Sequence, residues 1–95
     1  MIIQIVKFET TLSEDEVMTI ANGRADRFRA LPGLLQKYYV KLDQANHYGG
    51  VYIWDSAESM AAFRESDLAA SIPAAYKVKG KPTIEIMHTL FQLRE

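Results

Sequence analysis

The sequence contains no cysteine and only two histidines among its 95 residues. Without cysteine, the chain has no disulfide framework, no thiolate metal site and no cysteine nucleophile. His47 and His88 lie far apart and lack acidic neighbours at a metal-ligand spacing, so we expect no metal site. The nucleophile elbow of hydrolases and the glycine-rich phosphate loop are absent as well. These absences exclude conventional hydrolases, kinases and dinucleotide-binding enzymes.

The chain also lacks concentrated charge and long apolar runs. Its formal net charge is -1, and its 11 Lys and Arg residues are scattered, which is not the pattern of a protein that binds nucleic acid or an anionic membrane. No apolar run approaches the roughly 20 residues that span a bilayer. The N-terminal segment has neither the basic region nor the cleavage site of a signal peptide. We expect a cytoplasmic protein without nucleic-acid or membrane partners.

Hydrophobic residues make up 48% of the chain and charged residues 24%, values typical of a folded globular protein. A chain of this length can build one hydrophobic core but not two. We therefore expect a single domain over residues 1–95.

Local sequence patterns predict the secondary structure of the first half of the chain. Ile2 to Phe8 is apolar and β-branched, as in a buried strand. Ser13 and Glu16 have the spacing of a capping box, and apolar residues then recur at intervals of three and four up to Pro32, which predicts an amphipathic helix. Two runs rich in aromatic residues follow, separated by a short polar break, and they predict a β-hairpin with strands over 34–42 and 47–54.

Local patterns in the second half of the chain predict a second helix and a last strand. Asp55 or Ser56 can cap a helix that runs through residues 60–64. This helix either continues or restarts over 66–71, and Pro73 is expected to interrupt it. The alternating segment from 83 to 93 predicts a last strand, with Ile84, Ile86 and His88 in one row.

The order βαββαβ is typical of an α+β fold of the ferredoxin-like type, with a four-stranded antiparallel sheet and the helices on one face. The other face is then bare. An apolar bare face is too large a patch for an ordinary soluble monomer, so we expect a homodimer whose sheets cover each other.

The hairpin carries most of the aromatic side chains. With a four-residue loop over 43–46, alternation places two sets on one face, Leu35, Lys37, Tyr39 and Lys41 from the first strand and Tyr48, Gly50, Tyr52 and Trp54 from the second. The opposite face is aliphatic. Tyrosine and tryptophan are enriched at protein interfaces and in ligand pockets alike, so dimer packing and ligand binding are both open for the aromatic face.

Two polar residues lie in apolar rows. Arg24 falls within the apolar stripe of the first helix, where a guanidinium needs an acceptor or a wet cavity. It either pairs with a carboxylate such as Glu85, extends along the helix edge, or holds an anionic or phenolate oxygen of a ligand. His88 is either a core residue or a base.

The motifs of the hairpin and its flanks resemble those of the YdhR-type monooxygenases. They are Pro32-Gly-Leu-Leu-Gln-Lys-Tyr-Tyr-Val40, Tyr48-Gly-Gly-Val-Tyr-Ile-Trp-Asp-Ser56, Met60-Ala-Ala-Phe63 and Gly80-Lys-Pro-Thr83. That family is similar to the antibiotic-biosynthesis monooxygenases of the dimeric α/β-barrel superfamily. The resemblance implies two ferredoxin-like subunits with their sheets face to face and a small-molecule pocket in each subunit between sheet and helices.

The resemblance also implies a chemistry that needs no metal, flavin or haem. A phenol or quinol is deprotonated in a dry pocket, its carbanion reduces dioxygen, and a peroxy adduct collapses to the product. Trp54 matches the aromatic residue that ends the third strand in these enzymes and would line the pocket. Related oxygenases often carry a histidine in the next helix, where this chain has Phe63.

Three hypotheses follow. The first is a homodimeric, cofactor-independent monooxygenase that binds a small aromatic molecule and dioxygen. In it, Trp54, Tyr52 and Tyr39 shape the pocket, Arg24 holds an oxygen and His88 is the candidate base. The second is a non-catalytic module that binds a small ligand or serves in stress. The third is a haem-binding or haem-degrading protein, and fold class does not choose among the three.

Overall fold

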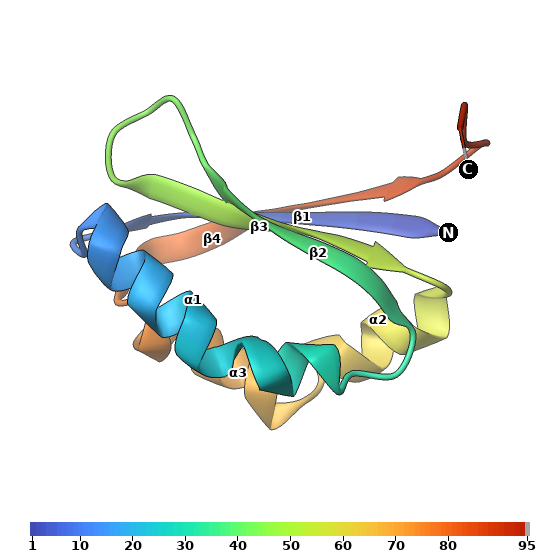
Figure 1. Cartoon of the computed structure of the whole chain (residues 1–95), viewed down its shortest axis with the longest axis horizontal. Coiled ribbons are helices and arrows are strands. Elements are labelled where there is room, and N and C mark those ends of the chain that lie inside the picture. Colours follow the sequence, from blue (N-terminus) through green and yellow to red (C-terminus); the bar gives the residue numbers. More distant parts are fainter. Residues whose placement is uncertain (95) are drawn as a thin grey trace.

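A computed structural model describes residues 1–94 of the chain. Its elements are β1 (Ile2–Thr10), α1 (Glu14–Arg29), β2 (Leu34–Lys41), β3 (His47–Trp54), α2 (Ala57–Arg64), α3 (Asp67–Ala75) and β4 (Val78–His88). The sheet is antiparallel with the strand order β2-β3-β1-β4, and the helices lie together on one side of it (Figure 1). The predicted ferredoxin-like arrangement is confirmed. None of the helices in the described part of the chain is long and apolar enough to cross a membrane.

Serine caps fix where the helices begin. At α1, the Glu16 amide donates to Ser13 Oγ and the Ser13 amide donates to Glu16 Oε1, at 3.2 and 3.0 Å, which completes the predicted capping box. Ser56 Oγ caps α2 by accepting from the Ser59 amide, and Ser66 Oγ caps α3 by accepting from the Ala69 amide, so the chain restarts its helix after residue 64. The expected interruption at Pro73 was wrong. Pro73 lies inside α3 near its C-terminal end, where the proline removes only one intrahelical hydrogen bond.

The last strand begins and ends five residues earlier than predicted. It runs from Val78, opposite Thr10, to His88, opposite Ile2, so it uses the whole length of β1 as its partner. Residues beyond His88 have no strand to pair with because β1 ends there. Pro82 is accommodated because β4 is an edge strand and its pairing with β1 is irregular between Lys79 and Thr83.

The hairpin register places the aromatic residues on the helix side of the sheet. Lys37 lies opposite Tyr52 and Tyr39 opposite Gly50, as predicted. A bulge between Leu34 and Gln36 changes the phase at the start of β2, so Leu34 and not Leu35 lies opposite Trp54. The aromatic face therefore packs under the helices and is not available for packing against a second subunit's sheet.

Two core clusters fill the layer between sheet and helices. The first contains Ile2, Phe28, Tyr52, Trp54, Met60 and Phe63. The second contains Phe8, Ala21, Tyr48 and Tyr76. The register places another set of apolar side chains, Ile3, Ile5, Tyr38, Val51, Ile53 and Met87, on the side of the sheet away from the helices, and we call this the open face.

Candidate functional site

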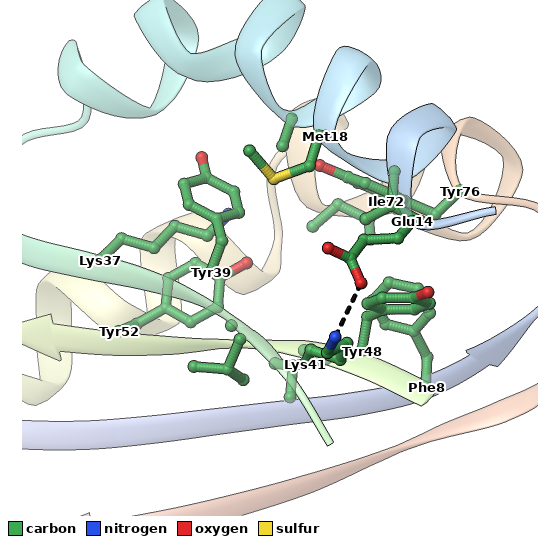
Figure 2. Close-up of a pocket in the computed structure, with 16 residues that line it drawn as sticks. Phe8, Glu14, Met18, Lys37, Tyr39, Lys41, Tyr48, Tyr52, Ile72 and Tyr76 are labelled. Atoms are coloured by element: carbon green, nitrogen blue, oxygen red, sulfur yellow. Dashed lines mark hydrogen bonds and ion pairs between the residues drawn. The ribbon is translucent and has the colours of Figure 1, made fainter. Parts of the chain in front are cut away.

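A cavity of about 140 Å³ lies between α1 and the strands β2 and β3. Its lining residues come from β1, α1, β2, β3 and the α3 region: Val6, Phe8, Glu14, Val17, Met18, Ala21, Lys37, Tyr39, Val40, Lys41, Tyr48, Gly49, Gly50, Tyr52, Ile72 and Tyr76. Figure 2 shows Lys37, Tyr39 and Tyr52 on one side of this α1 cavity and Phe8, Tyr48 and Tyr76 on the other. The α1 cavity thus lies at the junction of the two core clusters.

The floor of the α1 cavity is hollow because Gly50 has no side chain. Gly50 lies between Tyr39 of β2 and Val6 of β1 in the sheet. A Cβ at this position would come within 3.1 Å of the Tyr52 ring and 3.2 Å of Lys37 Cε. Any larger side chain would therefore occupy the space that separates the two core clusters.

An ion pair crosses the mouth of the α1 cavity. Lys41 Nζ lies 2.9 Å from Glu14 Oε1, so the pair connects β2 with the first turn of α1 (Figure 2). Both side chains are more than half exposed, which makes the pair a weak one in free energy. It marks the side on which the α1 cavity meets solvent.

Lys37 is held in a cage of three aromatic rings. Its Nζ lies 3.5 Å from the ring centre of Phe28, 4.3 Å from that of Tyr39 and 4.5 Å from that of Tyr52. These contacts favour the ammonium form. The ammonium has no ion-pair partner in residues 1–94.

The environment of Lys37 lowers the pKa of its amine to about 7, first because burial removes the ammonium from water and second because Arg24 repels it. Lys37 therefore gains and loses its proton near neutral pH. An amine of this kind is a competent base in an apolar pocket.

A second hollow of about 310 Å³ adjoins the first along β2. It is lined by Ala25, Phe28, Arg29, Leu34, Leu35, Gln36, Lys37 and Tyr39. Because Lys37 and Tyr39 also line the α1 cavity, these two side chains form the partition between both spaces.

The tyrosines Tyr39, Tyr52 and Tyr76 around the α1 cavity keep their protons at neutral pH. Burial raises the pKa of the Tyr39, Tyr52 and Tyr76 hydroxyls above the ordinary value of 10.0, although Arg24 acts in the opposite direction on all three. At neutral pH these hydroxyls are hydrogen-bond donors to a ligand oxygen, not anions.

The structure places Tyr39 and Tyr52 at the α1 cavity and Trp54 behind them. Trp54 is completely buried, its ring stacks on Tyr52 with the planes 2° apart, and its Nε1 donates to Gln4 Oε1 at 2.9 Å. Trp54 lies outside the linings of both hollows. It touches the site through Tyr52.

Arg24 reaches α3 instead of the sheet. Its Nη2 donates to Ser71 Oγ at 2.7 Å, and its buried Nε has no hydrogen-bond partner in the described chain. A pair with Glu85, one of the alternatives considered for Arg24, is not made. Glu85 lies on the opposite side of the sheet and pairs with Lys7 at 3.8 Å.

His88 lies apart from the α1 cavity. It is exposed at the end of the edge strand β4, opposite Ile2. The α1 cavity meets β1 only from Val6 onward, four residues along the strand, or about 13 Å at the usual rise per residue. The structure therefore brings Tyr39, Tyr52 and the unforeseen Lys37 together, with Arg24 and Trp54 behind them and His88 elsewhere.

Sequence reasoning placed Lys37 on the aromatic face but assigned it no role. The available signal was a lysine in the middle of a row of aromatic side chains that alternation places under the helices. A lysine at such a position has to be either paired or shifted in pKa.

Comparisons with known proteins agree with this architecture. A search of curated proteins finds no match. The structure of SnoaB, a cofactor-independent oxygenase from Streptomyces nogalater, aligns with a TM-score of 0.77 at 14% identity, over 99% of this chain and 97% of that one. An antibiotic biosynthesis monooxygenase aligns with a TM-score of 0.74 at 14% identity, over 95% and 99%. MhuD with two manganese protoporphyrin IX molecules per active site aligns with a TM-score of 0.76 at 16% identity, over 100% of both chains.

At these identities the structures show a shared fold and no more. The sequence itself matches the family model described as "Putative mono-oxygenase ydhR" over residues 2–94. That match spans nearly the whole chain and every element of the sheet and the helical layer. The protein belongs to the ydhR mono-oxygenase family.

Proposed function

We propose that the protein is a cofactor-independent monooxygenase that oxidises a small phenol or quinol with dioxygen in the α1 cavity. The observation that carries this proposal is an aromatic-lined hollow between the helices and the sheet, with a weakly basic amine, Lys37, in its wall. Membership of a mono-oxygenase family and a shared fold with a cofactor-independent oxygenase support it. Histidine, cysteine and acidic side chains form no metal-binding group within residues 1–94.

The reaction needs no electron donor besides the substrate. Loss of the hydroxyl proton makes the ring electron-rich, and the ring carbon that becomes nucleophilic forms a bond to one atom of dioxygen. The peroxide takes up the proton that the hydroxyl lost, and the hydroperoxide then loses water together with the hydrogen on the same carbon, which leaves a carbonyl there. One oxygen atom ends in the product and the other in water, and the substrate supplies all the electrons. The protein contributes a dry cavity, orientation and stabilisation of the phenolate.

The side chains around the α1 cavity have distinct roles in this proposal. Tyr39 and Tyr52 shape the space and donate hydrogen bonds to ligand oxygens. Trp54 keeps the Tyr52 ring in place by stacking on it. Arg24 supplies positive charge from the α1 side. His88 has no part at this cavity, given its position at the far end of β4.

Oxygen uptake tests the proposal. We expect the purified protein, treated with chelator, to consume dioxygen with at least one member of a panel of hydroquinones, naphthols and anthrones. Replacing Gly50 by leucine fills the α1 cavity and should abolish this uptake, because the new side chain meets Tyr52 and Lys37. Gly23→Ala is the matched control, since a Cβ there meets open space, and it should retain full uptake.

Two other results would replace the proposal. If ligands raise the melting temperature but no compound consumes oxygen, the protein is a binding module. A Soret shift on adding hemin, with no uptake on the phenol panel, would indicate a haem-binding protein. Neither hollow is lined by histidine, so Met18 or a tyrosine would have to be the axial ligand.

We also propose that two subunits pair through their open faces. Four aliphatic side chains on the two central strands, Ile3, Ile5, Val51 and Ile53, form the middle of this face, with Tyr38 and Met87 57% and 43% exposed beside them. Leu90, Phe91 and Leu93 follow β4 and are 94%, 80% and 86% exposed. A second copy is the partner that covers such a surface by symmetry.

A charge at the centre of the open face should prevent this pairing. We expect wild-type protein at micromolar concentration to sediment as a dimer and Val51→Lys to sediment as a monomer, because an unpaired ammonium would be buried in the interface. Ala62→Lys adds the same charge on an exposed position of α2 and should leave the dimer intact. A monomeric wild-type protein would contradict the proposed pairing.

A further inference from the structure

Lys37 lies in the wall of the α1 cavity with Arg24 behind it, and the one carboxylate of the lining, Glu14, is paired with Lys41. Arg24 is held by the neutral hydroxyl of Ser71, and Lys37 by three aromatic rings. The ion pairs found in residues 1–94 involve other basic residues. Two positive groups that are partly buried and repel each other form a site that lacks an anion.

The charged groups that line the α1 cavity besides Lys37 are Glu14 and Lys41, and these two pair with each other. The groups that act on the amine or its neighbours are Arg24 and Arg29 from α1, Tyr39 from β2, Tyr52 from β3, and Tyr76 after α3. The three tyrosines hold their protons more tightly than usual. None of these tyrosines is therefore expected to give its proton to Lys37 in place of a ligand.

We propose that Lys37 is the proton acceptor of the α1 cavity and that the cavity selects an acidic phenol or enol, bound as its anion beside Lys37 and within the field of Arg24. This inference rests on the proposed function and names its base and its substrate class. The hydroxyl proton of the ligand moves to Lys37 Nζ, the O–H bond breaks, and the electron pair stays on the ligand oxygen. The products of this step are an ammonium and a phenolate, which attract each other strongly in an apolar site.

The cage of three aromatic rings can hold Lys37 both when its amine is neutral and when it is protonated. Contact with Phe28, Tyr39 and Tyr52 keeps Lys37 in place when it is neutral, by apolar packing of its stem. The same rings stabilise the ammonium once the proton has arrived. A ligand that brings negative charge removes the repulsion from Arg24, so proton transfer and binding favour each other.

A ligand that reports its own ionisation tests this step without turnover. Nitrophenols absorb at longer wavelength when ionised, and their nitro group withdraws the electrons that oxidation requires. We expect para-nitrophenol or a nitronaphthol to bind as the phenolate and its titration midpoint to fall by about one pH unit or more on binding. Lys37→Met should lose this shift and weaken binding roughly 10- to 100-fold, the loss typical of a charge-assisted hydrogen bond.

Two further variants distinguish the effect of the positive charge at position 37 from the effect of proton transfer, and both from an effect on folding. Lys37→Arg keeps a fixed cation, so it should still bind the nitrophenolate but should oxidise protonated phenols much more slowly than the wild type. Lys81→Met, on the exposed part of β4, removes an unrelated lysine and should change neither quantity. Melting temperatures of all variants show that each is folded.

The results that would overturn this inference differ from those that would overturn the proposed function. An unshifted nitrophenol titration, a shift that survives in Lys37→Met, or no binding of either nitro compound would exclude Lys37 as the proton acceptor even if phenols are oxidised. Conversely, a shift that depends on Lys37 without any oxygen uptake would retain the acidic-ligand site and reject the oxygenase.

Discussion

Replacing Trp54 by alanine is expected to lower the free energy of unfolding by about 3–5 kcal/mol, the range observed for removal of a large buried aromatic side chain. Trp54 is 0% exposed and packs against Tyr52 and Phe63, with ring centres 6.1 and 5.4 Å away. The substitution removes this packing and also the hydrogen bond to the buried Gln4. Urea denaturation followed by circular dichroism measures the loss.

Trp54→Phe separates the two contributions. It keeps an aromatic ring in the core but leaves Gln4 Oε1 without its donor, which costs roughly 1–3 kcal/mol. Trp54→Phe should therefore be less destabilised than Trp54→Ala. If both variants lost less than about 1 kcal/mol, Trp54 would not be the centre of the core, and its support of Tyr52 would have to be abandoned.

Replacing Lys37 by methionine is expected to stabilise the protein at pH 7 by about 1–3 kcal/mol, because the variant no longer has to bury an amine whose proton is destabilised by its surroundings. The pKa of Lys37 falls from 10.5 to about 7 on folding. Between these values the unfolded chain binds more protons than the folded one, so the stability of the wild type rises with pH across this range.

The stability advantage expected for Lys37→Met decreases as the pH rises. Below pH 7 the cost of burying the ammonium is constant and the advantage of Lys37→Met is largest. As pH rises toward 10.5 the lysine becomes neutral in the unfolded chain too, and the advantage shrinks. Urea denaturation of both proteins at several pH values measures the difference. An advantage that stays constant or grows with pH would mean that the folded protein does not depress this pKa.

The two outcomes expected for Lys37→Met are those of a site selected for function. The same substitution is expected to raise stability and to weaken the binding of an acidic phenol. A side chain that destabilises the fold but improves ligand binding is typical of a functional site, where stability and activity are often opposed.

The fold could be predicted from local signals that do not depend on distant contacts. The capping box at Ser13 and Glu16, and the two aromatic runs around a polar turn, specified the elements and their order. The predicted strand boundaries were wrong where they depend on the partner strand. The bounds of β4 follow from the length of β1, and the phase of Leu34 follows from a bulge that alternation does not reveal.

The site was predictable only in part. Alternation grouped Tyr39, Tyr52 and Trp54, but it could not show that Trp54 lies behind the lining while Lys37 lies in it. The pKa of Lys37 depends on its burial and on Arg24, and both Arg24 and the Phe28 ring that packs on the amine come from another part of the chain. Ser71 as the partner of Arg24 depends on how α3 packs against α1, and no sequence spacing encodes that contact.

Oxidation with isotopically labelled dioxygen tests most directly whether this chain is an oxygenase that uses no cofactor. The chelator-treated wild-type protein, given a phenol that it turns over, should place one labelled oxygen atom in the product, and Gly50→Leu should place none. Product oxygen that comes from water, or labelling that requires added metal, flavin or haem, would contradict the account.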